Sequence, residues 1–375
     1  MVKKIYLDNA ATTPVSKEVI KEMEKYYLEE YGNPSSMHEL GERAFEAVKD
    51  ARKTLASEIG CRAWEIVFTS GSTESNNLAF FGLSRGELGK KRKKIIISKI
   101  EHSSIYAICE RLKKEGFEIV EVPVSKEGMV DLDRLEKEIN GETLLVSIIH
   151  VQNEIGVIQD LKKIGKICLE KGVKFHTDAA QSFGKLDIRV KDWGVDLLSC
   201  GGHKIGGPKG IGFLYVKEGL KLEPLIYGGG QEKGVRGGTE NVSGIIGFSR
   251  ALEITKGIDW VEIEKIRDYF IIELEKLGGK INGSKEKRIS NNVNISFLGI
   301  DGEGVVLTLS EKGIMCSTGS ACESKSKKEN KVLKAIGLNQ KGIDGSLRFS
   351  LNPGTSKEDI DYVLEELKVI LRNKK

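Results

Sequence analysis

The chain has 375 residues, of which 39% are hydrophobic and 30% are charged. A chain of this length can bury a large core, and we expect one large and one smaller domain. Its 59 basic and 55 acidic residues leave a net charge of only +4, so nothing points to a nucleic acid or an anionic membrane as a partner.

The sequence also lacks the segments that would send a protein to another compartment. No apolar run reaches the ~18 residues of a membrane span, and MVKKIYLDNAATTP does not resemble a signal peptide. We therefore expect a cytoplasmic protein. The cysteines form no CxxC pair and have no histidine at zinc spacing, so we expect reduced thiols and no metal. They are Cys61, Cys109, Cys168, Cys200, Cys316 and Cys322.

The N-terminal part predicts a short strand at residues 5–7, the polar turn DNAATTP and a helix over about 16–31. GNPSSMH follows, and then a second helix over about 41–59, whose apolar residues recur at spacings of three and four. His38 in GNPSSMH is a lone histidine in a Ser-rich loop. We expect it to be structural or exposed rather than catalytic.

Residues 65–77, EIVFTSGSTESNN, indicate a phosphate site. A β-branched strand turns through Ser70, Gly71, Ser72 and Thr73 into a helix. Hydroxyls and backbone N–H groups therefore gather at a helix N-terminus, which favours an anion. An ordinary N-cap would explain Ser72 or Thr73 singly, but less readily the whole run. The chain has no GxxxxGK[ST] and no GxGxxG, so the phosphate of a cofactor fits better than a nucleotide.

Strands and helices then alternate, which is typical of a parallel sheet covered by helices. His102, Asn153 and Asp178 each follow a predicted strand, at the edge where ligands bind in open α/β sheets. The basic run at 90–94 has no interleaved aromatic residues, so we interpret it as a solvated loop rather than an RNA contact. Helices are expected near 132–139 and 161–171.

The glycine-rich segment at residues 199–212, SCGGHKIGGPKGIG, places His203 and Lys204 among six glycines. Glycine lets a bulky group approach the backbone, and a lysine held away from water is a nucleophilic amine suited to Schiff-base chemistry. Asp178, 26 residues earlier, could be the acid that the pyridine nitrogen of pyridoxal phosphate (PLP) requires. Taken singly, an ordinary surface lysine and a turn-capping aspartate remain alternatives.

The last third of the chain predicts a small α+β domain. A glycine-rich segment at 227–244 carries Arg236 and Thr239 and is expected to protrude toward a neighbouring subunit. A helix over 260–277 is expected to link the domains. Strands at NNVNISF, GIMCS and SLRFSLN then follow, with helices over about 302–311 and 357–372.

Two side chains in this domain carry chemistry. Cys322 lies in CSTGSACESKSKKENK, a run with little apolar content whose lysines favour the thiolate, so we interpret it as reactive. Arg348 is a lone cation on an alternating apolar strand. We interpret it as the ligand of a substrate carboxylate.

Taken together, these segments resemble the cysteine desulfurases of the NifS and IscS type, PLP enzymes of aminotransferase class V. The motifs that carry the resemblance occur in the family's order along essentially the whole chain: YLDNAATTP, GNPSSMH, FTSGSTESNN, EHSS, QNEIG, HTDAAQ, GGHKIGGPKGIG, RGGTEN, STGSACES and LRFSL. The resemblance implies the α/β, PLP-dependent transferase fold of type I. Residues 15–258 would form a large PLP-binding domain with a mainly parallel seven-stranded sheet. Residues 1–14 and 259–375 would form a smaller α+β domain that carries the catalytic cysteine loop.

The resemblance also implies roles for individual residues. The catalytic residues would be Lys204, which forms the Schiff base with PLP, His102, which stacks on the ring and relays protons, and Cys322, which accepts the sulfur. The further PLP ligands would be Asp178 at the pyridine nitrogen, Gln181 at the phenolic oxygen, Gly71, Ser72, Thr73 and His203 around the phosphate, and Thr239 from the partner subunit of a homodimer. The substrate ligands would be Asn153, Arg348, Asn9 and Ala10.

The implied reaction takes sulfur from L-cysteine, releases L-alanine and leaves a persulfide on Cys322. Sulfur acceptors such as an iron–sulfur scaffold or a tRNA-thiolation enzyme would then be partners, with no direct contact to nucleic acid. A selenocysteine lyase, another class V enzyme and a non-catalytic sulfur-relay or scaffold-binding protein are the alternatives. The sequence departs from the family at Gly201, where a hydroxyl residue is usual, and at Asn352, where a glycine is commoner.

Overall fold

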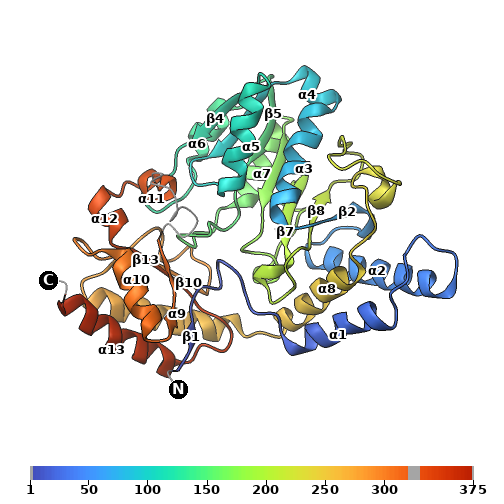
Figure 1. The fold of residues 1–375 in the computed structure, drawn as a ribbon. Helices are drawn as coiled ribbons and strands as arrows, with labels where there is room; N and C mark the ends of the chain where they lie inside the picture. Colours follow the sequence, from blue (N-terminus) through green and yellow to red (C-terminus); the bar gives the residue numbers. More distant parts are fainter. Residues whose placement is uncertain (1–2, 320–329, 374–375) are drawn as a thin grey trace.

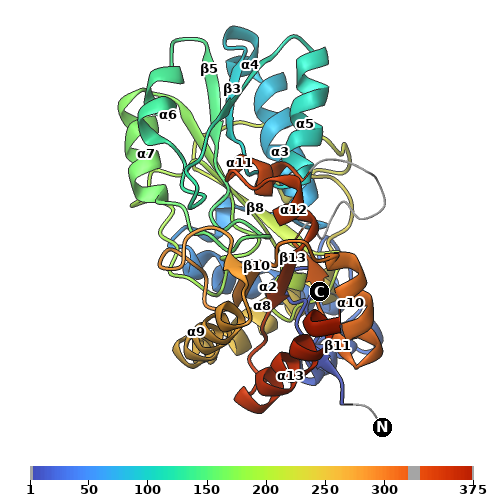
Figure 2. The ribbon, with the colours of Figure 1, turned by 90° about the vertical axis from the view of Figure 1, so that its left-hand side faces the viewer.

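The computed structural model of the protein describes residues 3–319 and 330–373 (Figures 1 and 2). A seven-stranded sheet forms the centre of the larger part. Every neighbouring pair in it is parallel except those of β8, which runs antiparallel to both β2 and β7. The α/β fold with a mainly parallel seven-stranded sheet is therefore confirmed. The order of the strands is β2 (Ile66–Thr69), β8 (Gly212–Val216), β7 (Leu197–Gly201), β6 (Lys174–Asp178), β5 (Thr143–Ser147), β3 (Lys94–Ser98) and β4 (Glu118–Val122).

Helices cover both faces of this sheet. Strand β3 shows why: Ile96 packs into the core on one face, while Ile95 and Ile97 pack into the core on the other. A strand buried on both sides reads as a continuous apolar run. One face is covered by α1 (Lys17–Leu28), α2 (Glu39–Glu58), α6 (Leu132–Glu138), α7 (Leu161–Glu170) and α8 (Val242–Lys256), and the other by α3 (Ser72–Arg85) and α5 (Ser103–Lys114), with α4 (Glu87–Lys91) beside α3.

The smaller part has its own sheet and its own core. Its antiparallel sheet has the order β12 (Ser317–Thr318), β13 (Ser346–Ser350), β10 (Asn292–Ser296) and β9 (Lys280–Ile281). Near the N-terminus, β1 (Ile5–Tyr6) pairs in parallel with β11 (Ile314–Met315). The helices of this part are α9 (Trp260–Lys276), α10 (Gly302–Glu311) and α13 (Lys357–Asn373), which lie at the bottom left of Figure 1.

Two short helices bridge from the smaller part to the end of the large sheet. Residues of α11 (Lys331–Ala335) and α12 (Gln340–Asp344) share an apolar cluster with residues that follow β3 and β5. Both helices accordingly lie between the two parts in Figure 1. The site described below lies at this junction.

Two expectations need correction. Helix α9 does not link the parts, because Ile263, Phe270 and Leu274 all pack into the core of the smaller one. The link is the short segment between α8 and α9. The basic run is not one solvated loop either, since it closes α4 and its last member, Lys94, begins β3 and pairs with Glu138 at 3.1 Å. The domain limits at 15–258, 1–14 and 259–375 stay predictions. Within the described residues, no helix is both long and apolar enough to cross a membrane.

Candidate active site

A cavity of about 510 Å³ opens at the carboxyl ends of the large sheet's strands, where the smaller part meets them. It brings together most of the side chains that the sequence singled out. They come from the turn after β2, from the segments after β3, β5, β6 and β7, from the N-terminal segment and from β13. The predicted residues that line the cavity are Ala10, Gly71, Ser72, Thr73, His102, Asn153, Asp178, Gln181, His203, Lys204 and Arg348.

Three predicted residues are not part of this cavity's lining. Thr239 is exposed on the segment between β8 and α8. Asn9 lines a neighbouring cavity instead. Cys322 lies outside the described residues.

Lys204 ends the single 3₁₀ turn Gly202–Lys204 that follows β7. Its Nζ donates to the carbonyl oxygens of Ala10 and Ala11, the latter at 2.7 Å. The Nε2 of Gln181 donates to the same Ala10 carbonyl at 2.8 Å. The N-terminal segment therefore holds the amine of Lys204 and the amide of Gln181 at one side of the cavity.

Asp178 ends β6 and is almost fully buried, with 3% of its surface exposed. Its Oδ2 accepts a hydrogen bond from Asn76 at 2.9 Å, and its Oδ1 accepts one from the backbone N–H of Ala180 at 2.9 Å. Two donors thus fix the carboxylate at the edge of the sheet. Sequence reasoning missed Asn76, although its position one turn into the helix after Ser72 was the available signal.

Burial disfavours the charged form of two histidines of the cavity. The backbone N–H of Ser104 donates to Nδ1 of His102 at 3.2 Å, so the neutral ring carries its proton on Nε2. Burial lowers the pKa of His102 below its ordinary value; the Asp178 carboxylate opposes this shift and the Lys204 charge adds to it. Burial, reinforced by Lys204, lowers the pKa of His203 to about 4.

The turn into α3 offers an anion site. Gly71 has φ 147°, a conformation that favours glycine, and Ser72 begins the helix. The Ser72 Oγ is buried and has no hydrogen-bond partner within the described ranges. The first backbone N–H groups of an α-helix have no partner inside the helix and attract negative charge. A buried hydroxyl without a partner beside such a helix end fits a phosphate.

Arg348 on β13 is 1% exposed and lies across the cavity from this turn. One terminal nitrogen donates to Asp8 at 2.7 Å and the other to the carbonyl oxygen of Asn153 at 3.3 Å. Its Nε is buried and has no partner among residues 3–319 and 330–373. The guanidinium is therefore fixed in place and retains one unused donor. Sequence reasoning missed Asp8, because its partner lies 340 residues away.

Other residues of the cavity also escaped the sequence reasoning. The hydroxyl of Thr12 lies 3.1 Å from Nδ1 of His203. Glu74 accepts hydrogen bonds from the backbone N–H of Ser70 and from Arg236. Lys209 belongs to the glycine-rich segment itself, where its position five residues after Lys204 was the only signal.

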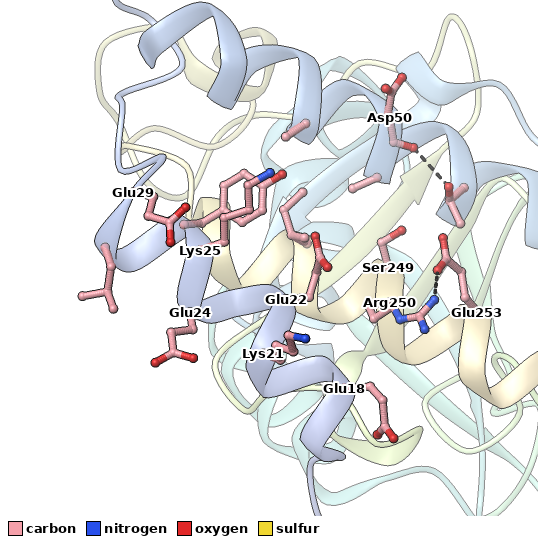
Figure 3. A pocket seen from close by; sticks show the side chains of 16 residues that line it. Glu18, Lys21, Glu22, Glu24, Lys25, Glu29, Asp50, Ser249, Arg250 and Glu253 are labelled. Carbon is pink, nitrogen blue, oxygen red and sulfur yellow. Dashed lines mark hydrogen bonds and ion pairs between the residues drawn. The ribbon is translucent and has the colours of Figure 1, made fainter.

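A larger cavity, of about 880 Å³, lies elsewhere, between α1, α2 and α8 (Figure 3). Six acidic and three basic side chains line it. Figure 3 shows an ion pair between Arg250 and Glu253, whose atoms lie 2.8 Å apart. It contains none of the residues that follow the strands, so the chemistry is assigned to the smaller cavity.

Comparisons with known proteins agree with this geometry. Residues 5–363 match the family described as Aminotransferase class-V. The chain belongs to this family. It is 46% identical over 376 residues to a cysteine desulfurase IscS of Dictyoglomus turgidum. The aligned region covers 99% of this chain and 95% of that protein. A cysteine desulfurase IscS of Methanosarcina thermophila is 45% identical, with 99% and 92% covered.

Solved structures show the same likeness. A NifS-like protein superimposes with a TM-score of 0.93 at 36% identity and covers 99% of this chain and 100% of its own. A structure described as SspA in complex with cysteine gives a TM-score of 0.85 at 38% identity, with 94% and 100% covered. Within the class V family, the chain therefore belongs to the cysteine desulfurases, as its motifs indicated.

Proposed function

We propose that this chain is a PLP-dependent cysteine desulfurase, which converts L-cysteine to L-alanine and retains the sulfur as a persulfide on Cys322. The observation that carries the proposal is the placement of Lys204, Asp178 and the Ser72 turn around one cavity of about 510 Å³. The relatives named cysteine desulfurase, and the similar structure that is described as a complex with cysteine, support the choice of substrate.

The residues present fit PLP. Asp178 would hold the pyridine nitrogen and Gln181 the phenolic oxygen, while Ser72, Thr73 and His203 would hold the phosphate. Lys204 is the amine that would attach the cofactor. When bound, PLP supplies an electron sink for the Cα–H bond of an attached amino acid.

The chain's own groups then handle the protons. Lys204 would be the base that takes the Cα proton of the substrate. The carbonyl oxygens of Ala10 and Ala11 keep its Nζ at the cavity. Burial lowers the pKa of His102 and the Ser104 N–H occupies its Nδ1, so the atom of His102 that would give and recover a proton is Nε2.

Arg348 and Asn153 would bind the substrate carboxylate, through the unused Nε of Arg348 and the Asn153 side chain. The charge of Arg348 supports this, because its guanidinium lines the cavity and pairs with Asp8 at 2.7 Å. Asn9 and Ala10 belong to the segment that positions these groups. Bidentate carboxylate recognition is the task for which a guanidinium is suited.

Cys322 is proposed as the sulfur acceptor. Its thiolate attacks the substrate's sulfur, an S–S bond forms and the C–S bond breaks. The electron pair of the C–S bond stays on carbon, which takes up a proton and leaves as alanine. Cys316 is a poor substitute, because burial raises the pKa of its thiol to about 12.

We further propose a homodimer in which Thr239 completes the phosphate site of the partner subunit. The exposed position of Thr239, outside its own cavity, supports this, and Tyr227 on the same segment is 79% exposed. The persulfide would pass to an iron–sulfur scaffold or a tRNA-thiolation enzyme. The five described cysteines are free thiols, which fits a cytoplasmic setting.

The experiment that tests the function is incubation of the purified chain with PLP and L-cysteine. We expect alanine and sulfide in the presence of a reductant, and alanine together with a labelled protein persulfide when the cysteine carries isotopic sulfur. L-Serine, which has no sulfur, is the control substrate. A protein that is loaded with PLP and forms no alanine from cysteine would contradict the proposal.

A further inference from the structure

A second cavity, of about 240 Å³, lies behind the active site, where the two parts of the molecule meet. Lys204 lines both cavities. The remaining wall of the second cavity comes from the N-terminal segment, the turn after β6, the end of α8, the start of α9 and the segment after β13. Its apolar lining residues are Pro14, Ile205, Ile254, Ile258, Leu351 and Pro353.

Three polar atoms of this lining stand out. They are Nζ of Lys185, Nε1 of Trp260 and Oδ1 of Asn9. All three atoms are buried, and none has a hydrogen-bond partner in the part of the chain that the structure describes. Native proteins leave few such atoms, and each one has a cost in free energy. Three of them around one cavity point to a ligand that satisfies them together.

The charge of the cavity favours an anion. Its lining contains no acidic residue, and Lys185 is the lysine of the lining that keeps its amine when Lys204 is attached to PLP as proposed. Lys185 is 9% exposed, and its Nζ lies 6.0 Å from the ring centre of Trp260. Burial, followed by the charge of Lys204, lowers the pKa of Lys185 to about 7. A buried ammonium is stable only with a charged or hydrogen-bonded partner, and an anion would supply one.

Asn9 adds the opposite requirement. Its Nδ2 donates to the carbonyl oxygens of Ser350 at 2.8 Å and of Tyr6 at 3.3 Å, which fixes the orientation of the amide. The atom left without a partner is therefore an acceptor. The ligand needs two acceptor sites for Lys185 and Trp260 and one donor for Asn9.

We propose that this cavity binds a small aliphatic acid with a hydroxyl or amino group on C2. Its carboxylate lies between Lys185 and Trp260, its C2 donor lies at Asn9, and its side chain packs on Ile254, Ile258 and Leu351. A volume of about 240 Å³ corresponds to about eight water molecules at ~30 Å³ each, which is enough room for a five-carbon acid. The site is separate from the proposed reaction, and no step of that reaction depends on it.

The test uses the full chain loaded with PLP. The protein has three tryptophans, so a Trp64→Phe, Trp193→Phe variant retains Trp260 as its only one. The probe is L-2-hydroxy-3-methylbutanoate, which has no amine and cannot attach to the cofactor. We expect a saturable change in Trp260 fluorescence. The uncharged 2-hydroxy-3-methylbutanamide should bind at least about tenfold more weakly, because it loses the charge-assisted bonds.

A matched pair of substitutions in the same background locates the site. Lys185→Met keeps the length of the apolar stem and removes the unpaired amine, so the variant should fold, which circular dichroism checks. It should weaken the binding of the hydroxy acid about tenfold or more. Lys256→Met, an exposed lysine at the end of α8 that pairs with Glu58, should bind like the parent.

Two outcomes would overturn the proposal. The first is the absence of saturable binding, which would mean that water alone fills the cavity. The second is equal binding by Lys185→Met and its parent, or by the acid and the amide, which would place the probe elsewhere, such as at Arg348. The alanine assay is not part of this test, so a failure here is distinguishable from a failure of the proposed desulfurase activity.

Discussion

The family resemblance predicts a hydroxyl residue where this chain has Gly201, and the structure shows what occupies that space. A Cβ atom at Gly201 would lie 2.8 Å from Oγ of Ser72. The backbone of Gly201 is extended, with φ −145° and ψ 144°, so the conformation itself does not require glycine. The hydroxyl of Ser72 and a side chain at position 201 would compete for one place beside the proposed phosphate.

This competition predicts a compensating pair of substitutions. Ser72→Ala should weaken PLP retention about tenfold to a hundredfold, because a bond to a charged group contributes roughly 1.5 to 3 kcal/mol. Gly201→Ser alone should give no gain, since it collides with Ser72. The double variant should recover most of the loss. Equilibrium dialysis of PLP measures all three, with Ser57→Ala on the exposed face of α2 as the control. If the effects of the two substitutions on PLP retention were independent and additive, the hydroxyls at positions 72 and 201 would not occupy the same place.

Lys204→Ala should abolish alanine formation, because it removes both the point of cofactor attachment and the proposed Cα base. The fold should survive, since the side chain is only half-buried and its bonds go to two backbone carbonyl groups. Lys221→Ala, an exposed lysine, is the control and should react like the parent. Sulfide production by Lys204→Ala at the parent rate would refute the assignment of this lysine.

Cys316 and Cys322 should differ in their importance. Cys322→Ser should load PLP and bind L-cysteine but form no labelled persulfide, because a serine hydroxyl is hardly ionised at neutral pH. Cys316→Ser should still form it, since burial raises the pKa of the Cys316 thiol to about 12 and keeps it protonated. Labelling with isotopic cysteine, followed by mass spectrometry, decides between them. A label on Cys316 in the Cys322→Ser variant would show that Cys316 can accept the sulfur and would contradict the assignment of Cys322.

At the scale of whole elements, long periodic helices were predicted well, whereas two short helices were not predicted. The helix expected over 302–311 is α10 at Gly302–Glu311, and the helix expected over 41–59 is α2 at Glu39–Glu58. The helices α11 and α12 were missed. Each has only five residues, so its stability depends on packing rather than on its own sequence. Val332 and Ile343 provide that packing through contacts with distant residues.

A steric prediction follows from the contact between strand β8 and the turn before α3. A Cβ atom at Gly212 would lie 2.4 Å from the carbonyl oxygen of Cys200 and 2.7 Å from Cα of Gly71. Both contacts are to backbone atoms, which cannot rotate away. Gly212→Ala should therefore destabilise the protein by about 1 to 3 kcal/mol and weaken PLP retention, because Gly71 shapes the proposed phosphate turn.

Gly141→Ala is the matched control for that substitution, since no atom lies within 4 Å of the added Cβ. Urea unfolding and PLP dialysis measure the two effects. Loss of stability without any loss of PLP retention would show that β8 does not position the turn.

At the scale of the whole molecule, most of the residues that the sequence singled out line one cavity, but the sequence did not predict how the N-terminal segment joins them. Residues 8–13 run between the two parts and supply Asp8 to Arg348 and the Ala10 carbonyl to Lys204. Such contacts between distant residues depend on the relative placement of two sheets. No local pattern of charge or hydrophobicity encodes them. The substrate role that the motif resemblance implies for Asn9 stays a prediction, and the residue lines the second cavity.

Buried titratable groups couple the whole fold to pH. His150 and His176 are 4% and 0% exposed, and burial lowers the pKa of each to about 3. An unfolded histidine titrates near ~6.5, so between pH 6.5 and 3 the unfolded chain binds protons that the folded one does not. Stability therefore falls by about 1.4 kcal/mol per pH unit for each histidine as the pH drops. Burial raises the pKa of Glu101 to about 8, which gives one opposite contribution between pH 8 and about 4.5.

These three groups together predict a net loss of about 1.4 kcal/mol per pH unit between pH 6.5 and 5, because two histidines outweigh one carboxyl. His176→Gln can still bond the hydroxyls of Ser147 and Ser199, which now contact the imidazole at 2.8 and 3.0 Å, but it cannot titrate. The free energy of unfolding of His176→Gln should therefore fall less steeply with decreasing pH than that of the parent, by about 1.4 kcal/mol per pH unit. This difference does not depend on the stability of the variant at pH 7. Urea unfolding at pH 6.5, 5.75 and 5 measures the slope, and the exposed His38→Asn should retain that of the parent. An unchanged slope in His176→Gln would show that this histidine is protonated within the folded protein.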